Sequence, residues 1–113
     1  MHEMALCESL LQAIEESALT NRFTRVRRVR LEIGRFAGVE VEALRFGFDV
    51  VMRGSLAEGA ELVVLDVPGR AWCFDCNDTV EIDDRFAPCP RCGGDRLRPS
   101  GGTDLTIKDL EVD

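Results

Sequence analysis

Four of the five cysteines form two closely spaced pairs, and their spacing is that of a metal site. Each pair follows the pattern Cys-x-x-Cys, a tight knuckle that presents two thiolates to one ion, and two facing knuckles complete a tetrahedral shell of four sulfurs. Such a closed shell leaves no open position for a substrate, so the site is expected to be structural. Metal binding would then supply on the order of 10 kcal/mol toward folding the surrounding lobe. The predicted ligands are Cys73, Cys76, Cys89 and Cys92.

Two disulfides or an iron centre are the alternatives for these cysteines. The N-terminus, Met-His-Glu-Met, lacks the basic start of a signal peptide, so a cytoplasmic location is expected, where thiols stay reduced. The second pair with Gly93, expected at a sharp turn, resembles a rubredoxin knuckle. Asn77, not glycine, follows the first pair, which favours Zn²⁺ over iron.

The N-terminus gathers several nitrogen ligands. His2 is the only histidine, and a residue of this size is expected to protect Met1 from removal. The free amine of Met1, the amide and imidazole of His2, and the amide and carboxylate of Glu3 can then surround one ion. Nitrogen-rich ligation with oxygen in reserve suits Ni(II) or Cu(II). The alternative is an exposed, frayed terminus.

Two further features have structural explanations beside functional ones. Cys7 lies on the apolar stripe of the first expected helix and is interpreted as a small buried hydrophobic residue. A basic stripe is interpreted as the solvated face of a strand, with a docking patch for an acidic protein as the alternative. This stripe consists of Arg25, Arg27, Arg28 and Arg30.

Composition limits the classes of function. The 113 residues suffice for one ordinary domain, or for one small core and a metal-stabilised lobe. The formal net charge of −7 argues against nucleic-acid binding, which needs a positive surface. No apolar run approaches the ~20 residues that a membrane span requires.

The periodicity of apolar residues predicts an α+β fold. A small three-stranded sheet is expected to carry two helices on one face, with a zinc-ribbon-like lobe inserted before the last strand. Gly54 is expected to cap the second helix, and Pro68-Gly69 is expected to end a strand. Ser100-Gly101-Gly102 is expected to form a flexible exit from the lobe, and Asp109 is expected to mark a bulge in the last strand. The expected order is helix 4–20, a strand around 28–33, a helix from 39 or 40, strand 61–67, the cysteine-rich stretch 70–99, and strand 105–112. The predicted domains are residues 1–69, completed by 101–113, and residues 70–100.

Taken together, these motifs resemble the HypA/HybF family of hydrogenase nickel-incorporation proteins over essentially all 113 residues. The resemblance rests on the Met1-His2-Glu3-Met4 start, the paired cysteines, and Ile-Gly-Arg-Phe-Ala-Gly-Val at 33–39 leading into Glu-Val-Glu-Ala-Leu-Arg-Phe at 40–46. It implies a nickel metallochaperone that binds Ni²⁺ at its extreme N-terminus. It also implies delivery to the immature large subunit of a [NiFe] hydrogenase, with the GTPase HypB as a partner.

The resemblance also implies roles for individual residues. The family's nickel site falls on His2 and Glu3, and an acidic residue at the start of the second helix in some members matches Glu40. Zinc falls on the four paired cysteines, while Cys7 has no family role. No catalytic Ser/His/Asp or Cys/His set and no phosphate-binding glycine loop is present, so an enzyme is not expected. The alternatives are a zinc-ribbon adaptor in transcription or RNA handling and a rubredoxin-like electron carrier.

Overall fold

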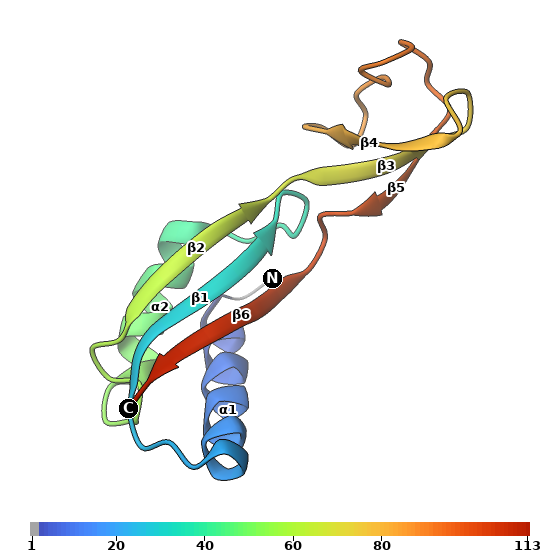
Figure 1. Ribbon diagram of the computed structural model, residues 1–113. Helices are drawn as coiled ribbons and strands as arrows, with labels where there is room; N and C mark the ends of the chain where they lie inside the picture. Colours follow the sequence, from blue (N-terminus) through green and yellow to red (C-terminus); the bar gives the residue numbers. More distant parts are fainter. Residues whose placement is uncertain (1–2) are drawn as a thin grey trace. The chain divides into compact units, whose positions relative to one another are not determined.

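A computed structural model describes residues 3–113, and within this range the chain forms two helices and six strands (Figure 1). The α+β class expected from the sequence is confirmed. The predictions for Met1 and His2 lie outside the described residues. The elements are α1 Glu3–Asn21, β1 Val26–Gly34, α2 Val41–Met52, β2 Glu61–Val67, β3 Gly69–Cys73, β4 Asp78–Ile82, β5 Leu97–Gly101 and β6 Leu105–Val112.

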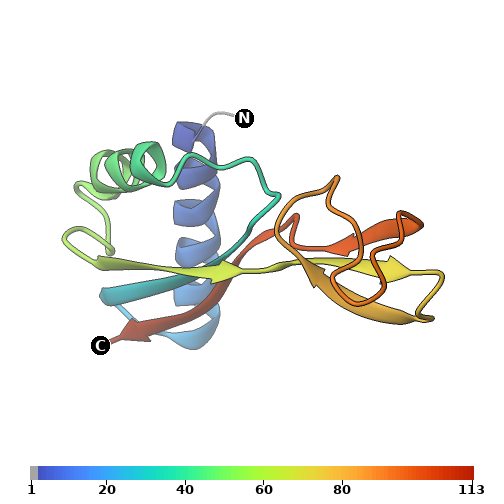
Figure 2. The same cartoon turned by 90° about the horizontal axis from the view of Figure 1, so that it is seen from above.

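The larger strands form a three-stranded sheet in the order β2-β1-β6. The arrows of β1 and β2 run in the same direction and that of β6 runs opposite (Figure 1). A parallel pair needs a crossover connection, and α2 is this crossover. Both helices lie on the same face of the sheet (Figure 2), as the sequence predicted. No helix in residues 3–113 is both long and apolar enough to cross a membrane.

The chain divides into two compact units. The first comprises residues 1–31, 39–64 and 107–113, of which residues 1 and 2 are not described. Its core forms because the apolar stripes of both helices and one face of β1 are removed from water. The largest fully buried side chains of this unit are Ile14 and Cys7 of α1, Val26, Val29 and Leu31 of β1, and Leu44, Phe48 and Met52 of α2.

The second unit comprises residues 32–38 and 65–106. It contains a second three-stranded sheet, β4-β3-β5, in which β3 pairs antiparallel with both neighbours. The sequence analysis expected a metal lobe here without these strands. The core of the unit is small and includes two of the paired cysteines. It consists of Ala71, Cys73, Val80, Ile82 and Cys89, with Phe36, Cys76 and Leu97 packed against it.

Residues 100–102 are not the flexible exit that the sequence suggested. Ser100 and Gly101 belong to β5, and Gly102 has a φ of +89°. A Cβ on Gly102 would lie 2.7 Å from the Cα of Gly69, and a Cβ on Gly34 would overlap the carbonyl of Gly102. Three distant segments therefore pass one another here with their backbones in contact. Pro68 separates β2 from β3, and Gly69 already begins the next strand.

Candidate metal centres

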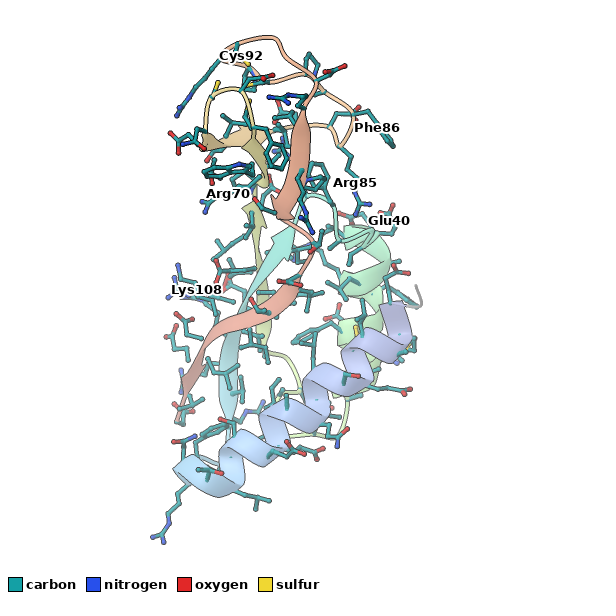
Figure 3. All side chains as sticks on the ribbon, turned by 90° about the vertical axis from the view of Figure 1, so that its right-hand side faces the viewer. Glu40, Arg70, Arg85, Phe86, Cys92 and Lys108 are labelled. Atoms are coloured by element: carbon teal, nitrogen blue, oxygen red, sulfur yellow. The ribbon has the colours of Figure 1, made fainter. Side chains whose placement is uncertain are left out.

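The four paired cysteines lie together in the second unit. Their Sγ atoms are all within 4.8 Å of one another, and Figure 3 shows sulfur atoms gathered beside Cys92. The Sγ–Sγ distance is 3.7 Å between Cys73 and Cys92 and 3.8 Å between Cys76 and Cys89. Zn–S bonds of about 2.3 Å in a tetrahedron place sulfurs about 3.8 Å apart. The cluster therefore has the size of a tetrathiolate metal site.

The two knuckles share a backbone hydrogen bond and a left-handed residue at equivalent positions. The N–H of Asn77 donates to the carbonyl of Cys73 at 2.8 Å, and the N–H of Gly93 donates to the carbonyl of Cys89 at 2.8 Å. Both donors are in the left-handed region, with φ of 55° at Asn77 and 73° at Gly93. Asparagine is one of the few residues besides glycine that visits this region. Asn77 thus replaces the missing glycine, and its presence does not distinguish zinc from iron.

Hydrogen bonds to sulfur shift the pKa values of Cys89 and Cys76 in opposite directions. The pKa of Cys89 is lowered to about 6, first because the backbone N–H of Cys92 donates to its sulfur. The pKa of Cys76 is raised to about 12, first through its side-chain hydrogen bond with Cys92. Four neighbouring thiolates repel one another, so full deprotonation of the cluster needs a cation at its centre. The donor set consequently fits a divalent metal ion.

Two ion pairs tie each knuckle to the chain that follows the other. Arg96, beyond the second knuckle, donates to Asp75 within the first at 2.7 Å. Arg91, within the second, donates to Asp78 beyond the first at 2.9 Å. These pairs are exposed and contribute little to stability by themselves. Their reciprocal arrangement orients the two knuckles toward each other.

The described part of the predicted nickel site lies where the two helices begin. Glu3 is the first residue of α1, and its carboxylate accepts a hydrogen bond from the backbone N–H of Glu40 at 3.2 Å. Glu40 is the N-cap of α2, as Figure 3 shows, and its carboxylate accepts from the N–H of Glu42 at 3.3 Å. Two of the four predicted nickel residues are thus hydrogen-bonded neighbours.

Cys7 has the structural role that the sequence analysis favoured. Its side chain is fully buried, and its thiol donates to the carbonyl of Leu44 at 3.4 Å. Burial, followed by the charges of Glu3 and Glu8, raises the pKa of this thiol to about 11. It faces Gly47 of α2, a residue that the sequence analysis overlooked. A glycine inside a helical pattern was the available signal.

The basic stripe lies beside acidic residues of the same unit, which accept hydrogen bonds from its arginines. Arg28 donates to Glu61 of β2 and to Glu111 of β6, each at 3.0 Å. This arrangement favours the solvated face of a strand over a docking patch for an acidic partner, because the charges are already paired. The remaining contacts are Arg27 with Asp113, Arg30 with Asp109, and Arg25 with the carbonyl of Glu58.

Comparison with known proteins gives a match along the whole chain. The family model described as "Hydrogenase/urease nickel incorporation, metallochaperone, hypA" matches residues 1–112. Proteins named hydrogenase maturation factor HypA from Xanthobacter autotrophicus and Azorhizobium caulinodans are 73% and 71% identical over 112 residues, covering 99% of each chain. The solution structure of the Ni metallochaperone HypA from Helicobacter pylori has the same fold. It aligns with a TM-score of 0.73 at 24% identity, covering 99% of this chain and 97% of that one.

Proposed function

Because the chain belongs to the HypA family of hydrogenase and urease nickel-incorporation metallochaperones, we propose that it binds Ni(II) through its N-terminal residues and delivers the ion to the immature large subunit of a [NiFe] hydrogenase. A metallochaperone carries an ion without transforming it, so this role is not an enzymatic one. The observation that carries the site assignment is the hydrogen bond between Glu3 and Glu40. It joins the start of α1, which directly follows His2 in the sequence, to the acidic N-cap residue of α2.

The proposed nickel ligands are the free amine of Met1, the amide and imidazole of His2, and the amide of Glu3, with the Glu40 carboxylate in reserve. The carboxylate of Glu3 accepts the Glu40 N–H, which supports an anchoring role for this side chain. A site at a chain terminus lets an acceptor ligand bind the ion before the donor ligands leave. Delivery by ligand exchange therefore needs no chemical step within this chain.

We assign the four-cysteine cluster to one structural Zn²⁺ ion. The support is the pair of Sγ–Sγ distances of 3.7 and 3.8 Å, which match the edges of a tetrahedral ZnS₄ centre. When bound, the ion would cross-link the two knuckles and supply folding free energy to the second unit. A rubredoxin-like electron carrier would hold iron in the same four sulfurs. The visible spectrum separates the two, because a ferric tetrathiolate absorbs strongly and zinc does not.

The partner and compartment belong to the same proposal. The sequence carries no phosphate-binding glycine loop, so nucleotide hydrolysis would belong to a separate GTPase, HypB. The cytoplasm is the expected place of action, since free thiols persist there. A zinc-ribbon adaptor for nucleic acid is the competing function. The net charge of −7 weighs against it, and filter binding at low salt would reveal it.

The decisive experiment follows nickel from this chain to the acceptor. Untagged protein loaded with radioactive Ni(II) is mixed with the metal-free hydrogenase large subunit, HypB and GTP, and the nickel bound to the large subunit is counted. We expect transfer from the wild-type chain and none from His2→Ala, with zinc content equal in both. Equal transfer from the two chains would contradict delivery through the N-terminus.

A further inference from the structure

Two contacts hold the first turn of α1 against α2. The first is the hydrogen bond from the N–H of Glu40 to the carboxylate of Glu3, at 3.2 Å. The second lies one turn further along α1, where Cys7 shares the helix face of Glu3, four residues on. Its buried sulfur lies against Gly47 and donates to the carbonyl of Leu44. Both contacts thus lie on one face of α1, at its N-terminal end.

Gly47 lets the two helix backbones approach closely. A Cβ at this position would lie 3.2 Å from the Sγ of Cys7, 3.7 Å from the Cα of Met4 and 3.8 Å from the carbonyl oxygen of Glu3. The tight contact is with the sulfur, and the two backbone atoms of α1 would lie at ordinary van der Waals distance, so a Cβ would fill the remaining space between the helices. Glycine is unfavourable in the interior of a helix, so its presence at the centre of α2 needs a packing reason. The missing Cβ supplies this reason.

We propose that Gly47 and Cys7 are positioning residues for the terminal nickel site. Their close packing sets the register of α1 on α2 in which the carboxylate of Glu3 meets the amide of Glu40. Met1 and His2 are joined to Glu3 by consecutive peptide bonds, so the backbone that carries the terminal ligands starts from this contact. The inference rests on the proposed function, because it concerns the same nickel site. Neither residue is itself a ligand.

The test is a graded series at position 47. Gly47→Val adds two methyl groups beyond a Cβ that would already touch the backbone of Met4 and Glu3. It should weaken Ni(II) binding about tenfold or more, the usual effect of losing a residue that supports metal ligands. Gly47→Ala should weaken it less, because the nearest atom that it meets is the sulfur of Cys7. Cys7→Ala removes this sulfur, so the double variant Cys7→Ala/Gly47→Ala should recover most of the affinity that Gly47→Ala loses. Nickel titration of untagged, zinc-loaded protein measures each step.

A loss of stability alone does not predict this pattern. Ile14→Val is the control, since it trims a fully buried side chain of α1 well away from the first turn. It should lower the melting temperature and leave nickel affinity unchanged. Hydrogen exchange of the Glu40 amide in nickel-free protein is a second measurement, and should be faster in Gly47→Ala and slower again in the double variant.

Two results would overturn the inference, and they differ in meaning. If wild-type protein binds Ni(II) and His2→Ala does not, while the Gly47 variants bind as tightly as wild type, the positioning role is wrong and the proposed function stands. If wild type and His2→Ala bind alike, the ion sits elsewhere and both proposals fall. A Gly47→Val chain that does not fold leaves the test to Gly47→Ala and its rescue by Cys7→Ala.

Discussion

At the scale of the residue, the left-handed backbone after each knuckle shapes the four-sulfur site. Asn77→Ala should destabilise the second unit by about 1 kcal/mol, because alanine tolerates this conformation less well than asparagine. Asn77→Gly should be neutral or slightly tighter in metal retention. The rate at which a chelator removes zinc measures both, and Gly93→Ala, at the equivalent position of the other knuckle, should speed zinc release as Asn77→Ala does. Equal zinc release from Asn77→Ala and Asn77→Gly would show that this conformation does not limit the site.

The second prediction at this scale concerns the amine of Met1 and the imidazole of His2. His2→Ala should abolish specific Ni(II) binding without changing the fold or zinc content, and a peptide tag fused ahead of Met1 should do nearly the same by converting the amine to an amide. Because an unperturbed imidazole titrates near ~6.5, nickel affinity should fall as the pH drops through this region. Calorimetric titration at several pH values measures the change.

Variants of the two acids complete the nickel experiment. Glu3→Gln should weaken binding less than His2→Ala, since its amide remains, and Glu40→Gln less again. A tagged His2→Ala chain that binds Ni(II) as tightly as native protein would place the ion elsewhere, most simply in the cysteine cluster.

Some features of the metal sites could be identified from the sequence alone, and others could not. The four cysteines could be identified because a ligand pair three residues apart is a local property that needs no fold. The contact between Glu3 and Glu40 could not, since it joins residues 37 positions apart and depends on the register of two helices. The role of Gly47 was hidden for the same reason. The assignments of Met1 and His2 stay predictions.

At the scale of the element, the helices and the larger strands were predictable and the short strands were not. The bounds of α1 and the last strand agree with the periodicity to within a residue, because each buries one regular face. The strands β3, β4 and β5 have five residues each, and β5 exposes most of its side chains and contains Pro99. β3 and β4 bury alternate residues, but five residues are too few to establish this period from the sequence, and β5 has no alternation. The expected break at Asp109 coincides with consecutive half-buried residues, Asp109 and Leu110.

Because its core is small, the second unit is the part of the chain that is expected to need metal for folding. Outside the cysteines, the buried residues of the core cluster are Ala71, Val80 and Ile82, so little hydrophobic burial holds β4-β3-β5 without the ion. Chelation should collapse the amide resonances of residues 70–99 while those of α1 and α2 persist. Two-dimensional amide spectra before and after zinc removal report this directly. Unchanged resonances in the lobe would refute a structural role, and the same spectra decide whether the predicted domains 1–69 with 101–113 and 70–100 fold independently.

The pairing of β1 with β6 predicts a response to acid. Arg30 lowers the pKa of Asp109 below its ordinary 3.8, first through their hydrogen bond. A carboxyl with a lowered pKa in the folded state adds stability above its unfolded pKa, and this is lost as the pH falls through the folded value. Between about pH 5 and pH 3, wild type should therefore lose slightly more stability than Asp109→Asn, as measured by urea unfolding. Asp49→Asn, an exposed acid of α2, is the control and should follow the wild-type profile.

At the scale of the whole molecule, the two units offer different surfaces to a partner. Phe46 of α2 is 68% exposed and Phe86 of the second unit is 93% exposed. If HypB docks on the helix-and-sheet unit, Phe46→Ser should weaken the complex severalfold, because aromatic side chains, phenylalanine included, are enriched in the buried core of interfaces. Phe86→Ser, its matched control, should leave it unchanged. Sedimentation of the full-length chain with HypB would measure both, and the opposite ranking would place the partner on the metal lobe.

The contact among Gly34, Gly69 and Gly102 has a consequence for how this chain can diverge. Any side chain at Gly34 meets the backbone of Gly102, and any side chain at Gly102 meets that of Gly69. A clash introduced at one of these positions cannot be relieved by a second mutation at the other, because glycine has no side chain to shorten. Neutral substitution is therefore excluded at Gly34 and Gly102, while the surrounding strands remain free to change. In a saturation library selected for hydrogenase activity, they should retain glycine as strictly as the cysteines retain sulfur, although they bind no metal.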